Sequence, residues 1–170
     1  MKLSSTLPVL ALGATLALPA VANANDIRRG RNFGLGVVAG YPGFGASMNY
    51  FFSEHLSLQV DPQVYLWRGS LWAGGRVDLL FYPGEALVRH NAFDLLWYFG
   101  GGLGVGVGFS EGYVSVFPEL AVGIGFHFKR VPIDLMLEAV PQLWIGASRA
   151  GNDDLLHVWV TGALHCRYYF

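Results

Sequence analysis

The chain has 170 residues, of which 53% are hydrophobic and only 14% charged, and both glycine and aromatic residues are abundant. This composition is too apolar and too poor in charge for an ordinary soluble domain. The formal net charge of −1 excludes the basic surface that a nucleic-acid partner requires.

The first segment has the layout of a secretory signal peptide. An apolar run from Leu7 to Leu18 follows Lys2 and ends at Pro19, ahead of the small residues Ala22-Asn23-Ala24. We therefore expect residues 1–24 to be removed and residues 25–170 to form one exported domain. The basic residues Arg28, Arg29 and Arg31 then form a solvated start, or alternatively a contact with anionic lipid headgroups.

Alternation of apolar with polar or small residues marks the rest of the chain, and a period of two predicts strands. In Leu56–Trp67, leucine and valine occupy one face, and Gln59, Asp61 and Gln63 occupy the other. A helix over Leu95–Phe109 is excluded, because it would be too short to span a membrane and has a glycine at nearly every second position. The expected strands cover residues 33–40, 44–52, 56–67, 71–82, 93–109, 114–128, 133–145 and 156–170.

Eight strands predict an all-β fold, a closed antiparallel up-and-down transmembrane β-barrel. An even number of strands places both termini on one side, the periplasmic side of a bacterial outer membrane. The long connection from Pro83 to Ala92 then also lies on that side, although such barrels usually have their longer loops outside.

Three features favour an apolar face that points outward to lipid over a soluble, lipocalin-like barrel. First, that face stays apolar over the length of a membrane strand and carries aromatic residues near its ends. Second, the charges of the other face lie at mid-strand, and the only lysine after residue 24 is Lys129. Third, the chain closes with Arg167-Tyr168-Tyr169-Phe170. The aromatic residues near strand ends are Phe33, Phe81, Phe93, Phe109, Phe128 and Phe170.

The face that points into the lumen holds the candidate site. An interior of eight strands is just wide enough to be filled by side chains, so we expect a charge network that plugs it; the alternative is an acidic, cation-preferring path. Alternate glycines of one strand should give clearance for aromatics such as Trp72, Tyr98 or Trp144, or alternatively for a ligand. The charges are Asp61, Arg76, Asp78, Glu119, Asp134, Glu138 and Arg167, and the glycines are Gly100, Gly102, Gly104, Gly106 and Gly108.

A family resemblance accompanies these patterns. The segment Val131–Trp144, the Gly-rich first hairpin and the closing Cys166-Arg-Tyr-Tyr-Phe resemble small, uncharacterised OmpA-like outer-membrane barrels of Gram-negative bacteria. Tyr168 and Phe170 resemble the C-terminal signature read by the barrel assembly machinery. The resemblance implies that machinery, periplasmic chaperones and outer-membrane lipids or lipopolysaccharide as partners, and a monomer, but no common activity.

The expected function is therefore a non-enzymatic outer-membrane barrel with a structural or surface-interaction role and no cofactor. The alternatives are a narrow, porin-like pore and a barrel that handles lipids or small molecules, including a lipid A-modifying hydrolase or acyltransferase. The histidines lack metal-ligand spacing, and Cys166 falls on the lipid face. Candidate catalytic groups on the lumen side or near the outer end are His127, His157, His165, Ser110, Ser115 and Ser148, but no base and orienter can be assigned to a nucleophile.

Overall fold

The structure is a computed structural model that describes residues 30–41, 43–67, 70–109, 112–147 and 156–170. The predicted signal peptide, Arg28, Arg29, Ser110 and Ser148 lie outside these residues. Its strands are β1 (Phe33–Tyr41), β2 (Gly43–Phe51), β3 (Leu56–Trp67), β4 (Ser70–Phe81), β5 (Val88–Arg89), β6 (Phe93–Gly108), β7 (Tyr113–Phe128), β8 (Ile133–Ala147) and β9 (Leu156–Tyr169). No helix within the described ranges is long and apolar enough to cross a membrane.

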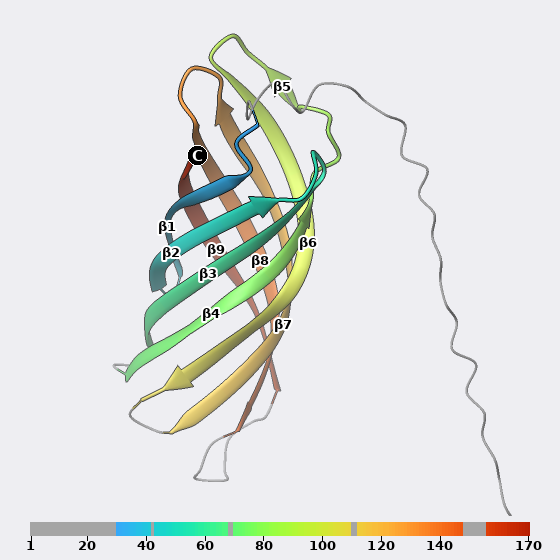
Figure 1. Ribbon diagram of the computed structural model, residues 1–170. Helices are drawn as coiled ribbons and strands as arrows, with labels where there is room; N and C mark the ends of the chain where they lie inside the picture. Colours follow the sequence, from blue (N-terminus) through green and yellow to red (C-terminus); the bar gives the residue numbers. More distant parts are fainter. Residues whose placement is uncertain (1–29, 42, 68–69, 110–111, 148–155) are drawn as a thin grey trace, which may run out of the picture.

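Eight long strands form a closed antiparallel barrel (Figure 1). Each pairs with the next long strand along the chain, and β1 pairs with β9 to close the ring. This confirms the predicted eight-stranded, up-and-down barrel. The sequence did not predict β5, a two-residue strand that pairs with β6 at the end of the barrel where Phe33 and Phe170 lie. We call that end the terminal end and the other the loop end.

The two faces of the barrel wall have opposite polarity. On β3, Ser57, Gln59 and Asp61 are fully buried in the lumen, whereas Val64 and Leu66 are exposed on the outside. The same inversion holds on the other long strands, so large aliphatic and aromatic side chains cover the exterior while most of the buried polar ones fill the interior. A soluble protein places these classes the other way round.

Exposed or half-buried aromatic rings form a belt around the terminal end. Rings from neighbouring strands are in contact, namely Phe33 with Phe170 at 6.4 Å between centroids and Phe81 with Phe99 at 5.4 Å. At the end of β2, the Tyr50 and Phe52 rings are 5.3 Å apart. Phe93, Phe126 and Phe128 continue the belt on β6 and β7. Its position at one end of an apolar wall resembles the aromatic girdle of a membrane barrel.

Prolines interrupt the pairing between two pairs of strands. Pro118 on β7 and Pro141 on β8 lie where the described pairs jump from Val116↔Ile145 to Glu119↔Gln142 and then to Val122↔Ala139. Pro62 on β3 lies at a similar gap between β2 and β3. Because proline has no N–H to donate, it weakens a strand ladder at its position. The β6–β7 seam, by contrast, is paired without a break from Phe93 to Gly108.

Candidate functional site

Arg76 on β4 is the centre of a buried charge network in the lumen. Its Nη2 lies 2.9 Å from an Asp61 carboxylate oxygen on β3, and it also donates to Glu138 on β8. Its other nitrogens lie 3.6 Å from Asp78 and 3.7 Å from Glu119. One cation therefore meets carboxylates from four strands inside the barrel.

Arg167 on β9 joins the same network from the opposite wall. This fully buried guanidinium donates from Nε to Ser47 Oγ at 2.8 Å, and from Nη2 to the side-chain oxygen of Gln59. Gln59 in turn donates to Asp61 at 3.0 Å and to Glu138 at 3.4 Å. The two arginines are thus linked through shared partners.

The strand register explains why these side chains meet. Asp61 is directly opposite Arg76 in the β3–β4 ladder. Asp78 and Glu119 flank Gly102, because Gly102 is the partner of both residues, one on each side of β6. A Cβ atom at Gly102 would lie 2.4 Å from Asp78 Oδ1. The absence of a side chain at this glycine therefore gives the Asp78 carboxylate its room.

The other glycines of β6 also make room for neighbouring groups. A Cβ at Gly104 would meet the Phe117 ring at 1.8 Å, and one at Gly108 would meet the Trp72 ring at 2.8 Å. At Gly106 the nearest atom is Ser115 Oγ, and at Gly100 the Leu79 carbonyl and the Leu80 side chain lie close. Of the aromatics expected against this stripe, only Trp72 lies there. Tyr98 packs on Gly123, and Trp144 stacks on Phe117.

The remaining predicted residues lie elsewhere in the barrel. Asp134 pairs with His127 at 2.7 Å towards the terminal end, and Tyr168 and Phe170 belong to the aromatic belt, where their rings are 5.0 Å apart. His157 is exposed near the loop end rather than enclosed in the lumen. Cys166 is exposed on the outer face, as its position in the alternation predicts.

Several network members were not selected from the sequence. Ser47, Gln59 and Tyr98 are fully buried, and Tyr98 donates to Glu138 at 3.0 Å. Their positions in the apolar–polar alternation could have identified them, since these positions place each polar group on the lumen side of its strand. The predicted network contained only charged residues, but a buried carboxylate needs neutral hydrogen-bond donors as well as counter-ions.

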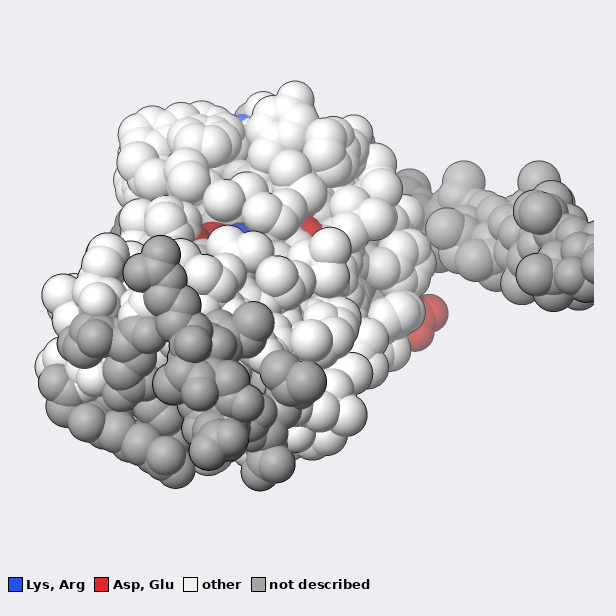
Figure 2. All heavy atoms as spheres, turned by 90° about the horizontal axis from the view of Figure 1, so that it is seen from below, with Lys and Arg blue, Asp and Glu red and all other residues white. Residues whose placement is uncertain are grey.

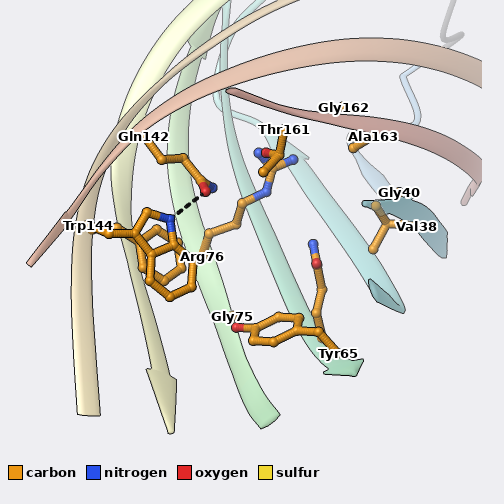
Figure 3. A pocket seen from close by; sticks show the side chains of 12 residues that line it. Val38, Gly40, Tyr65, Gly75, Arg76, Gln142, Trp144, Thr161, Gly162 and Ala163 are labelled. Atoms are coloured by element: carbon orange, nitrogen blue, oxygen red, sulfur yellow. Dashed lines mark hydrogen bonds between the residues drawn. The ribbon is translucent and has the colours of Figure 1, made fainter. Parts of the chain in front are cut away.

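A small pocket lies between the network and the loop end (Figure 3). It has a volume of about 40 Å³, which corresponds to roughly three water molecules. Trp144 and Gln142 stand on one side, opposite Val38 and Gly40, and Trp144 donates to Gln142 at 2.9 Å. Tyr65, Arg76 and Phe117 also line it. Aromatic faces and amide groups therefore surround this space.

The lumen around Arg76 holds more carboxyl groups than guanidinium groups. Asp61, Asp78, Glu119 and Glu138 oppose the two guanidinium groups of Arg76 and Arg167. Viewed from the loop end, small acidic and basic patches are visible in a recess near the middle of the surface, and one acidic group projects at its edge (Figure 2). The described residues contain no group of three His, Cys, Asp or Glu side chains that could hold a metal ion.

Ser47 and His165 form the one serine–histidine contact of the central network, with Oγ 3.0 Å from Nδ1. The hydroxyl, however, donates to Asp61 at 2.6 Å and accepts from Arg167, and both residues are fully buried. A nucleophile needs a route to its substrate as well as a base. In this pair a histidine lies beside the serine, but both side chains are fully buried, which leaves a substrate no path to the hydroxyl.

Comparison with known proteins adds no family to this description. No protein-family model matches the chain, and no curated protein matches it either.

Proposed function

We propose that this protein is an integral outer-membrane barrel with a structural or surface-interaction role and a lumen closed by the Arg76–Arg167 network. The observation that carries the proposal is the inverted polarity of the wall. A closed barrel satisfies its backbone hydrogen bonds internally, and an apolar exterior of this extent is stable only when lipid or another apolar phase covers it.

Further features of the chain support this placement. The aromatic belt at the terminal end fits a membrane interface, and the apolar run of residues 7–18 fits export across the inner membrane. Catalysis is not part of the proposal, because the Ser47–His165 pair is sealed inside the network.

Fractionation of cells that express the full chain tests this function. We expect the protein in the outer-membrane fraction, resistant to carbonate extraction, and migrating differently on a gel before and after boiling. Recovery in the soluble periplasmic fraction with the same heat-modifiable migration would agree with the barrel fold but contradict the membrane placement. Recovery in the inner membrane would contradict it as well.

A further inference from the structure

The barrel wall is not equally tall on all sides. The last pair between β1 and β9 is Tyr41↔Gly162, so residues 156–161 of β9 pair with β8 alone among the described strands. At about 3.3 Å per residue and a tilt of about 40°, these six residues extend the wall by about 15 Å along the barrel axis. Figure 1 shows strands β1 and β2 ending well short of the loop ends of strands β8 and β9. We call this gap the β1–β2 notch; it lies on the loop-end side of Tyr41 and Gly43, beside residues 156–161 of β9.

The rim of the β1–β2 notch is strongly apolar on its outer side. Four side chains at this rim are more exposed than any other large hydrophobic side chain in the described ranges. Their exposed fractions are 76% for Val158, 69% for Leu66 and 66% for both Val160 and Phe44. The apolar exterior also continues towards the loop end on the neighbouring strands, where Leu71, Val114 and Ile145 are exposed. The notch therefore lies within the apolar band of the wall rather than beyond it.

The lumen pocket lies behind this notch. Seven of its twelve lining residues come from the strands that form or border the gap: Val38 and Gly40 on β1, Gln63 and Tyr65 on β3, and Thr161, Gly162 and Ala163 on β9. Two of the seven are glycines, which leave no side chain to close the space. At the β1–β2 notch, the apolar exterior thus meets a pocket that contains amide and hydroxyl groups.

We infer that the β1–β2 notch is a lateral port for a single-chain amphiphile of the outer leaflet. The polar head would enter the pocket near Gln63, Gln142 and Thr161, while the apolar chain stays in lipid against Val158 and Val160. This inference rests on the proposed membrane placement. Arg76, the charged residue of the pocket lining, already contacts four carboxylates, so a carboxylate head would find no free counter-ion there. The rings of Tyr65 and Trp144 can face an uncharged or a cationic head.

Photolabelling tests the port with three probes of equal chain length. The protein is refolded into phosphatidylcholine vesicles with a dodecanol, a dodecylamine or a dodecanoic acid that carries a diazirine beside its head. Labelled residues are then mapped by mass spectrometry. We expect the alcohol and the amine to label residues 63–65 and 160–163 at least five-fold more than the outer face of β7. The acid should show no such enrichment.

Substitution at the port supplies the control. Thr161→Trp fills the opening and should lower pocket labelling at least five-fold, whereas Leu103→Trp adds the same ring to the exposed outer face of β6, away from the port, and should not. Heat-modifiable migration reports whether each variant folds. In the wild type, excess unlabelled dodecylamine should compete for the pocket and excess dodecanoic acid should not, which tests the port independently of the variants.

Two results separate the port from the membrane placement. If the protein floats with the vesicles but is labelled evenly around its apolar wall, the port alone is contradicted. Labelling without any preference among the three heads contradicts it as well. A barrel that does not float with vesicles contradicts the proposed function, and the port with it.

Discussion

Each charge in the lumen depends on the others for its stability, and Arg76 is the residue on which most of them converge. Removal of one partner of a buried ion pair costs about 3–5 kcal/mol, because the other charge stays buried without compensation. Arg76 contacts four carboxylates. Its loss should therefore affect the fold more than the loss of any single acid.

We expect Arg76→Met to lower the free energy of unfolding by about 3–5 kcal/mol, because methionine keeps the bulk of the side chain and removes its charge. Urea unfolding in lipid vesicles, followed by heat-modifiable migration, measures this change. Arg89→Met on exposed β5 is the matched control and should have no effect. Recovery of part of the loss in the double variant Arg76→Met with Glu138→Gln would support charge as the cause. An unchanged midpoint for Arg76→Met would contradict the network's role.

Gly104 tests whether the glycine stripe serves packing. A Cβ at this position would lie 1.8 Å from the Phe117 ring, which cannot retreat easily because it stacks on Trp144 at 4.5 Å between centroids. We expect Gly104→Ala to destabilise the barrel by about 1–3 kcal/mol through overpacking. In Gly162→Ala the new methyl group meets nothing closer than 3.8 Å, so this variant should be neutral. Equal stability of the two variants would show that the stripe is not needed for packing.

Among the strands, the proline-interrupted seam between β7 and β8 should open more readily than its neighbour. Pro118 and Pro141 donate no hydrogen bond, whereas the β6–β7 seam is paired throughout. We expect amides near residues 116–122 that face β8 to exchange with deuterium faster than amides of the β6–β7 seam. Pro118→Val should slow them, since valine supplies the missing donor. Exchange at equal rates in both seams would contradict this account.

The strands were predictable from the sequence because each has one clear period. Asp61, Arg76 and Glu138 could be assigned to the lumen by parity alone, since a shift of one residue would have reversed both faces. The partners of Asp134 and the position of Tyr98 could not be assigned, because they depend on the stagger of the strands around the ring, which alternation does not encode. β5 was missed for a different reason: two residues are too few to show any period.

For the molecule as a whole, the filled lumen predicts a barrel that does not conduct. Arg76, Asp61, Glu138 and Arg167 are at most 5% exposed, and the pocket above them holds only about 40 Å³. An ion would have to displace a paired guanidinium and shed its own hydration in a space of that size, and both steps are costly. The surplus of acidic groups does not by itself make a cation path, because the acids are occupied by the two arginines.

Planar-bilayer recording of the purified wild type should therefore show no unitary currents above the lipid background. A variant without the central network, Arg76→Ser with Glu138→Ser and Arg167→Ser, removes both guanidinium groups and the Glu138 carboxylate that contacts Arg76. Provided that it keeps heat-modifiable migration, it should conduct and prefer cations, since Asp61, Asp78 and Glu119 remain. Currents of similar size from the wild type and the variant would contradict the plug, because the network would then obstruct nothing. A silent wild type beside a conducting variant would locate the barrier in these side chains rather than in the diameter of the barrel.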